Sequence, residues 1–400
     1  MSPSKETLSK FREEVATWMK ENVPKDPGFL LPMSFLEVGT EQQLDFLREW
    51  QYKLWNAGYL GMHWPTEFGG QGADPAFQSV VDVALKKHHA PIIFNTIGLN
   101  WVGPMLLDIG TDEAQQRYIK PLLTGEEIWC QGFSEPDHGS DLGSVQTKAE
   151  RDGDDYVING SKIWTTLGNY ADHMILLARS QPQTGRKYDG LSFFLSPMKV
   201  PGIEAHPIRK ITGEYGFNQI FFTDARIPAS CLMGEDGDGW RMAMKTLEYE
   251  RGVQAGQASA HWMVTVSIDD MVDELKTMQR NGKPLLEDPL VRDEVVKFII
   301  ENKALALSQR RARVSALTSD YPMGLALSGK YRGTEHSRRL RQFAVAMQGA
   351  TGSLFVDDPD AHRGGFWQRA YFTNFGATIG GGTTEIQANI IAKHVLGLPK

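Results

Sequence analysis

The first third of the chain is dominated by apolar positions at helical spacing. Apolar residues recur every three or four positions in the segment 5–20, which predicts an amphipathic helix that stops before Pro24. A second run of this kind covers 41–56, and a third extends from 75 to 125 with breaks at proline and glycine. The residues between the last two runs are too rich in Gly and Pro to be helical. This third is therefore predicted to be all-helical.

From about Trp129 to Gly234 the pattern changes to short β-branched or aromatic runs between turns, as in 173–178, 191–195 and 219–223. Strands at this spacing predict a compact β-barrel or sandwich. The runs 156–158 and 163–166 flank Asn159-Gly160, a dipeptide that favours a two-residue turn. We therefore predict a β-hairpin centred on Asn159-Gly160.

Long helical runs return after Trp240, at about 240–279, 289–318 and 322–348, with a last helix from about 384 to 396. Lengths of this order suit an antiparallel four-helix bundle. The predicted fold class is thus α+β multidomain, with three domains. We expect a helical N-terminal domain at 1–128, a β middle domain at 129–238 and a C-terminal four-helix bundle domain at 239–400.

Composition excludes several classes of function. The chain has 400 residues, with 42 basic against 49 acidic side chains and no basic arm, so nucleic-acid binding has little support. The two cysteines, Cys130 and Cys231, lack C-x-x-C spacing, which argues for reduced thiols and against a metal cluster. The N-terminus resembles no secretory or transit peptide, and no apolar run is long enough to span a membrane. We expect a cytoplasmic protein with no metal and no membrane or nucleic-acid partner.

The strongest chemical signal lies between 129 and 166. The turn-rich segment 134–141 can offer hydroxyl and backbone N–H donors, and the following strand carries Trp164 and Thr166. An indole face beside such donors suits a flat aromatic ligand. Taken alone, these residues are equally consistent with an ordinary surface loop and a core tryptophan.

Together, F-S-E-P-x-x-G-S-D at 133–141 and I-N-G-x-K-x-W-x-T at 158–166 resemble the FAD-binding signature of the acyl-CoA dehydrogenase family. Further marks of that family lie in its order along the whole chain, at 58–61, 65–70, 222–228, 234–240 and 382–387. The resemblance implies the acyl-CoA dehydrogenase fold, FAD as cofactor and an acyl-CoA substrate. It also implies that a carboxylate removes the α-proton of the thioester while hydride leaves Cβ for the flavin, giving a trans-2-enoyl-CoA.

The usual position of the catalytic Glu in the family, one residue before the last Gly-Thr, is Gly381 here. A subset of the family instead carries this Glu on a bundle helix directly before an Arg, and Glu250-Arg251 matches that arrangement. We therefore predict Glu250 as the base. Glu248 faces another side of the helix and is the weaker candidate.

The resemblance also assigns the binding residues. The cofactor would be held by the following side chains and backbone groups: Gln131, Phe133, Ser134, Ser140, Trp164, Thr166, Gln348, Gly352, Thr383, Glu385 and Gln387. Thr384-x-x-Gln387 fits a capping box, whose helix N-terminus would favour a pyrophosphate. The substrate would contact Ser140, Glu248, Arg251 and Gly382.

Two family features are weakened. Homotetrameric members carry an Arg that reaches the FAD pyrophosphate of a neighbouring subunit, and Met278 stands in its place. The neighbour-contacting motif survives only as Gln348 and Gly352. Two assemblies follow: an α2β2 heterotetramer with a similar subunit, or a homotetramer in which Arg280 or Lys276 replaces the missing Arg.

Electrons are expected to pass to an electron-transfer flavoprotein, in lipid or steroid catabolism or β-oxidation. The glycines at 380–382 remove side chains, which is compatible with a branched, bulky or steroid-like acyl group. Two alternatives remain open: a flavin monooxygenase or oxidase on the same fold, and a partner subunit without activity of its own.

Overall fold

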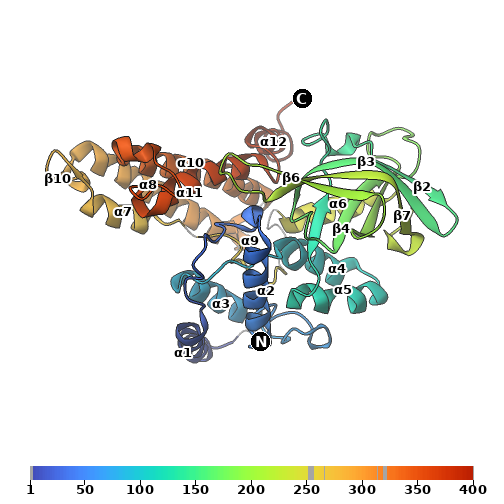
Figure 1. Cartoon of the computed structure of the whole chain (residues 1–400), viewed down its shortest axis with the longest axis horizontal. Helices are drawn as coiled ribbons and strands as arrows, with labels where there is room; N and C mark the ends of the chain where they lie inside the picture. Colours follow the sequence, from blue (N-terminus) through green and yellow to red (C-terminus); the bar gives the residue numbers. More distant parts are fainter. Residues whose placement is uncertain (1–2, 251–255, 265, 313, 319–321, 400) are drawn as a thin grey trace. The chain divides into compact units, whose positions relative to one another are not determined.

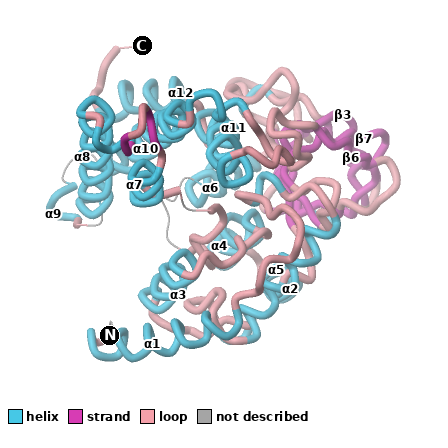
Figure 2. The backbone as a smooth tube through the Cα atoms, turned by 60° about the vertical axis from the view of Figure 1, so that its left-hand side comes forward, coloured by secondary structure: helices cyan, strands magenta, loops and turns pink. Residues whose placement is uncertain are grey.

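The computed structural model describes residues 3–250, 256–264, 266–312, 314–318 and 322–399. The chain forms two compact units, Met1–Val264 and Thr265–Lys400. In chain order the secondary structure is helical, then strand-rich, then helical, which confirms the predicted fold class (Figures 1 and 2).

The first unit begins with five α-helices: α1 Lys5–Asn22, α2 Glu41–Asn56, α3 Pro75–Lys87, α4 Gly103–Ile109 and α5 Asp112–Thr124. Most of them start at a side-chain cap, for example Thr40, whose hydroxyl accepts a hydrogen bond from the Gln43 N–H at 3.2 Å. Their apolar faces share one core, to which Trp50, Leu54 and Met105 contribute buried side chains. The predicted helical N-terminal domain is therefore confirmed.

Residues 129–233 form one eight-stranded sheet with the order β6-β7-β3-β2-β4-β5-β8, and β1 pairs in parallel with β4. The strands are β1 Trp129–Gly132, β2 Lys148–Asp152, β3 Asp155–Thr166, β4 His173–Arg179, β5 Leu191–Pro197, β6 Ile203–Ile208, β7 Phe217–Pro228 and β8 Leu232–Met233. Most neighbours are antiparallel, as expected for short strands joined by turns.

The predicted hairpin at Asn159-Gly160 is wrong. Residues 155–166 form one continuous strand, and the turn lies earlier, between Asp152 and Asp155 of β2 and β3. Asn159-Gly160 instead makes an irregularity in the pairing of β3 with β7, where Gly160 has φ +141°. The Asn159 side chain bonds Asp224 across the two strands, so the dipeptide is used for a bulge and not for a turn.

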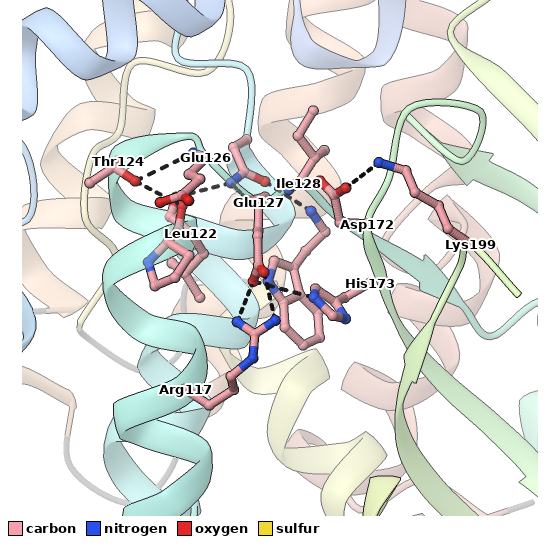
Figure 3. A network of polar contacts seen from close by, with 12 residues as sticks. Arg117, Leu122, Thr124, Glu126, Glu127, Ile128, Asp172, His173 and Lys199 are labelled. Atoms are coloured by element: carbon pink, nitrogen blue, oxygen red, sulfur yellow. Dashed lines mark hydrogen bonds and ion pairs between the residues drawn. The ribbon is translucent and has the colours of Figure 1, made fainter. Parts of the chain in front are cut away.

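A polar network joins the helices of the first unit to the sheet (Figure 3). Arg117 of α5 donates two hydrogen bonds to the Glu127 carboxylate, at 2.9 and 2.7 Å, and His173 of β4 lies 3.2 Å from the same carboxylate. Asp172 accepts a hydrogen bond from the Ile128 N–H at 2.9 Å and pairs with Lys199. These contacts fix the start of β1, which leads directly into the segment 133–141.

The predicted helix 240–279 is interrupted. Helix α6 covers Gly239–Glu250 and belongs to the first unit, where it packs against β5 and α4. Residues 256–264 form no helix, and Gly256 has φ +126°, which an α-helix does not accommodate. Their backbone groups pair with other segments; the Ser259 carbonyl, for example, accepts a hydrogen bond from Asn100 at 2.8 Å.

The second unit contains α7 Ile268–Thr277, α8 Pro289–Ala312, α9 Ser315–Thr318, α10 Pro322–Met347, α11 Phe366–Ile379 and α12 Thr384–Ile390, with a small ribbon of β9 Gln279–Arg280 and β10 Lys283–Pro284. Helices α7, α8, α10 and α11 contribute to one core. A helical bundle was predicted, but α11 was not. Among the described residues, the helices are too short or too polar to cross a membrane.

Candidate active site

The two signature segments of the sequence lie side by side in the first unit. The Ser134 carbonyl accepts a hydrogen bond from the Ile163 N–H at 2.9 Å. The Lys162 ammonium donates to the Phe133 carbonyl at 3.0 Å and to Glu135 Oε1 at 2.9 Å. Residues about thirty positions apart in sequence therefore form one platform between the end of β1 and β3.

Glu135 and Lys162 form a buried ion pair at the centre of this platform. The Lys162 side chain is 0% exposed and that of Glu135 6%. Burial lowers the pKa of Lys162 to about 8, although the charge of Glu135 opposes this shift. Burial alone would raise the pKa of Glu135, but Lys162 and hydrogen bonds from Thr147 and Gln146 bring it below its usual value. The pair holds the two signature segments in register.

Trp164 is presented to solvent by a strained backbone. Its φ is +61° at an irregularity of the β3–β7 pairing, and 56% of the residue is exposed. Phe217 supports the indole edge-on, with ring centroids 5.9 Å apart. A positive φ is costly for a large side chain, and such strain is typical of functional sites. An exposed, supported indole plane fits a flat cofactor such as a flavin.

The other residues assigned to the flavin lie on the same platform or beside it. Thr166 ends β3 and is 6% exposed, and Phe133 is buried against Phe193. The Gln131 side-chain oxygen is buried and has no hydrogen-bond partner among the described residues, as expected of a group that awaits a polar ligand. Ser140 is exposed in the loop that follows the platform.

A cavity of about 660 Å³ lies along α6. Its walls include Trp240, Arg241, Lys245 and Glu248 of that helix, with Asp108 and Tyr188 from other segments. The rings of Tyr188 and Trp240 stack with centroids 5.0 Å apart and an interplanar angle of 11°. Lys245 pairs with Asp108 at 2.8 Å and lies 4.0 Å from Glu248. The cavity thus combines an aromatic wall with charged groups of both signs, and its cations pair with acidic neighbours.

Glu250, the predicted base, is the last residue of α6 and is half-buried. Four residues earlier, Thr246 is fully buried and its hydroxyl contacts the sulfur of Met105 at 3.2 Å. Residues four apart share a helix face, so Glu250 extends the packed face of α6. Glu248, and not Glu250, is among the described residues that line the larger cavity. Arg251 lies outside the described residues.

The glycine-rich tail belongs to the second unit. Gly381 and Gly382 have φ values of +66° and +88°, and the Gly382 carbonyl accepts a hydrogen bond from Lys330 at 2.6 Å. No side chain is therefore available at the usual position of the family's base. The glycine at 382 also allows the Gln387 amide to reach back to the Gly381 carbonyl, at 2.9 Å.

The predicted capping box at Thr384 and Gln387 is wrong. The N-cap of α12 is Thr383, whose hydroxyl accepts from the Ile386 N–H at 3.2 Å. Thr384 instead donates to Glu335 at 3.0 Å. Glu385 lies in the first turn, where the backbone N–H groups and Thr383 lower its pKa.

The residues expected to serve a neighbouring subunit are held within the second unit. Gln348 is 7% exposed, and its side-chain oxygen accepts from Gln368 at 2.8 Å. Gln368 also donates to the Gly352 carbonyl at 3.3 Å. Met278 packs on the bundle core, Arg280 is exposed on the β9–β10 ribbon, and Lys276 pairs with Asp273 at 2.8 Å.

Several residues of the site were not singled out from the sequence. Glu135 and Lys162 are letters of the two motifs, so their pairing could have been suspected from the motifs alone. Asp108, Lys245 and Gln368 belong to no motif, and only the fold brings them to their partners. Among the described residues, His, Cys, Asp and Glu nowhere gather into a group able to hold a metal ion.

Comparison with known proteins identifies the class of protein to which this platform and cavity belong. The acyl-CoA dehydrogenase N-terminal, middle and C-terminal domain models match residues 5–126, 130–225 and 237–396. The chain therefore belongs to the acyl-CoA dehydrogenase family, whose members are FAD-dependent oxidoreductases.

Individual relatives agree over nearly the full length. The chain is 34% identical to acyl-CoA dehydrogenase IpdE1 of Mycolicibacterium smegmatis, over 98% of each protein. Its fold matches the Tcur3481-Tcur3483 steroid ACAD with a TM-score of 0.83, at 29% identity and 100% coverage of both chains. It also matches the ChsE4-ChsE5 complex of Mycobacterium tuberculosis with a TM-score of 0.78, at 26% identity, over 100% of this chain and 99% of that one.

Proposed function

We propose that this chain catalyses α,β-dehydrogenation of an acyl-CoA thioester to the trans-2-enoyl-CoA, with Glu250 removing the α-proton. The observation that carries the proposal is that a carboxylate is missing at one position where the family places its base and present at the other. Gly381 has no side chain where the family's usual base would be, and Glu250 ends α6 on its packed face. A family member needs one carboxylate for the α-proton, and Glu250 is the candidate that remains.

The location of Glu250 suits a base. Partial burial keeps water from competing with the substrate for that carboxylate. Bound FAD would supply the acceptor for the hydride that leaves Cβ. Hydrogen bonds to the thioester carbonyl would make the α-proton more acidic before Glu250 removes it.

The chain offers a set of residues for each ligand. Trp164 and Thr166 would contact the flavin ring. The residues proposed beside the ring are Gln131, Phe133, Ser134 and Ser140. Those proposed to bind the rest of the cofactor are Thr383, Glu385 and Gln387. For the substrate, the cavity along α6 has an aromatic wall that suits the adenine of coenzyme A. Ser140, Glu248, Arg251 and Gly382 remain the proposed substrate contacts.

Glu250→Gln tests the role of the base. The amide is isosteric but takes up no proton, so we expect reduction of bound flavin by acyl-CoA to slow by about 10²–10⁴-fold, with FAD content unchanged. The rate of flavin bleaching is measured anaerobically by stopped flow. Glu248→Gln, on the same helix, is the comparison variant: as a proposed substrate contact it should weaken acyl-CoA binding but retain most of the bleaching rate at saturating acyl-CoA. A Glu250→Gln enzyme that bleaches at a near-normal rate would contradict the assignment.

We further propose that reduced flavin passes its electrons to an electron-transfer flavoprotein and that the chain assembles with a second, similar subunit. Met278 packed on the bundle core supports unequal subunits, because an apolar side chain at this position offers no charge to a neighbour's pyrophosphate. The related steroid ACAD and ChsE4-ChsE5 structures are each named for two proteins.

A further inference from the structure

A second, smaller cavity of about 220 Å³ lies beside the C-terminal end of α6. Its wall includes His63, Trp64 and Pro104, together with Leu107, Asp108 and Tyr249. Asp108 also lines the larger cavity, so the two spaces adjoin the same carboxylate. Tyr249 directly precedes Glu250 in α6, so the cavity borders the part of the helix that carries the proposed base.

The polar groups of this wall are not equivalent. Asp108 Oδ2 accepts hydrogen bonds from Lys245 at 2.8 Å and from the Tyr249 hydroxyl at 3.1 Å, so both side chains have partners. His63 differs from them. Both of its ring nitrogens are buried, and neither has a hydrogen-bond partner among the described residues.

His63 is only partly buried, but its two inaccessible ring nitrogens favour a ligand that pairs with them, because native proteins leave few buried polar groups unpaired. Burial lowers the pKa of His63, an effect only partly offset by the nearby Gly256 backbone and the charge of Asp82. The imidazole is therefore neutral at pH 7, with one N–H donor and one acceptor. Such a group matches a hydroxyl or a ketone, whereas the Asp108 carboxylate in the same wall disfavours an anion.

The volume of the cavity further limits which ligands can fit. A cavity of about 150 Å³ can hold benzene, so this one has room for a single carbocycle. The side chains of Trp64, Pro104 and Leu107 supply the apolar contact that a ring needs.

We propose that this cavity receives the far end of the acyl group and that His63 hydrogen-bonds an uncharged oxygen carried on a ring there. The inference rests on the proposed dehydrogenation and names a substrate class for it. His63 is then a specificity-determining residue, because it favours binding of the oxygenated substrate and does not contact the reacting carbons.

The test compares three thioesters on the purified enzyme with any partner subunit it requires: 3-cyclohexylpropanoyl-CoA and its 4-oxo and 4-hydroxy ring derivatives. We expect kcat/KM for at least one oxygenated compound to exceed that for the parent by about tenfold or more. His63→Phe should abolish this preference, read as the ratio of kcat/KM values for the oxygenated and parent compounds, whatever happens to the parent compound's own rate. His63→Gln, which keeps a donor and an acceptor, should retain part of it and serves if the Phe variant does not fold.

Tyr249→Phe is the matched control, because it removes a hydroxyl of the same wall that already has a partner. Its oxygen preference should match that of the wild type, whatever happens to the overall rate. Binding of the unreactive thioether analogues, measured by calorimetry, should show the same ratios without turnover. Equal kcat/KM values for all three compounds, or a preference that survives in His63→Phe, would overturn the role of His63 and leave the dehydrogenation intact. Failure of every acyl-CoA to bleach the flavin would instead reject the proposed function, and this inference with it.

Discussion

At the scale of single residues, the buried pair of Glu135 and Lys162 explains why two distant motifs act together. Lys162 contacts the Phe133 carbonyl and Glu135, and the Glu135 carboxylate also accepts from the backbone N–H groups of Gln146 and Thr147. One ammonium thus ties β3 to the segment that would face the cofactor. A buried pair of this kind specifies a geometry more than it adds stability.

This predicts strong coupling between the two side chains. Lys162→Met leaves a buried carboxylate without its counter-charge, and Glu135→Gln leaves a buried ammonium, so each should lower the free energy of unfolding by about 3–5 kcal/mol. The double variant should lose clearly less than the sum of the two. Urea denaturation followed by tryptophan fluorescence measures all three, with FAD content as a second readout. Additive losses would mean that the two residues act independently.

The sequence identifies Trp164 as a candidate ligand contact but not how it is presented. Its positive φ arises from the irregular pairing of β3 with β7, and that irregularity depends on residues that lie far along the chain, such as Asn218. The same limit applies to His63. Only the fold shows that it shares a cavity wall with Asp108 and Tyr249 and that its ring nitrogens have no hydrogen-bond partner among the described residues. A sequence motif can be recognised along one chain, but whether each of its side chains has a hydrogen-bond partner is known only from the fold.

At the scale of elements, Asn159-Gly160 shows how a local signal can be overruled. The dipeptide favours a tight turn in isolation, but here the strand continues and the glycine absorbs a bulge at φ +141°. A Cβ at this position would lie 2.8 Å from the Thr147 hydroxyl and 2.9 Å from the Thr147 Cα. The glycine is therefore required by the approach of a neighbouring segment.

Gly160→Ala should accordingly destabilise the sheet by at least about 2 kcal/mol, from backbone strain and from overpacking against Thr147. Gly153→Asn is the matched control, because Gly153 lies in the β2–β3 turn at φ +63°, where a Cβ would have no atom within 4 Å, and Asn tolerates that conformation. Thermal unfolding of both variants decides the matter. Equal effects would show that the contact with Thr147 is unimportant.

Helix prediction failed in two informative places. The apolar period continues from α6 through residues 256–264, but the backbone of that segment finds its partners in the helical part of the first unit, for example where the Ile93 N–H bonds the His261 carbonyl at 2.8 Å. Helix α11 was missed because it is buried on more than one side, with Trp367, Gln368 and Arg369 all nearly inaccessible. A helix without a single apolar face gives a weak period.

At the scale of the whole molecule, the order of helical, strand-rich and helical parts can be predicted from the sequence. The spacing of apolar residues differs between helices and strands, and here each spacing persists over a long stretch. Assembly does not follow in this way. The choice between equal and unequal subunits depends on a few side chains, namely Met278, Arg280, Lys276 and Gln348, and on whether they are held inward or turned outward.

The flavin content of the chain purified alone tests the proposed assembly. Met278 packs on the bundle core, its N–H bonds the Glu274 carbonyl at 2.9 Å, and its carbonyl accepts from the Leu285 N–H at 2.8 Å, so the backbone here is fixed in place. We therefore expect half an FAD per chain or less when the chain is alone, rising when a similar second subunit is coexpressed. The visible spectrum gives the ratio of flavin to chain, and light scattering gives the mass.

Arg280→Ala separates the two assemblies further. Arg280 is exposed on the β9–β10 ribbon, and in a homotetramer it is a candidate for the missing pyrophosphate contact. In the heteromer proposed here, the second subunit supplies that contact, so Arg280→Ala and Lys276→Ala should both retain the flavin content of the parent complex. One FAD per chain in the protein alone, lost in one of these variants and kept in the other, would instead establish a self-sufficient homo-oligomer in which the residue whose loss removes FAD has taken over the role.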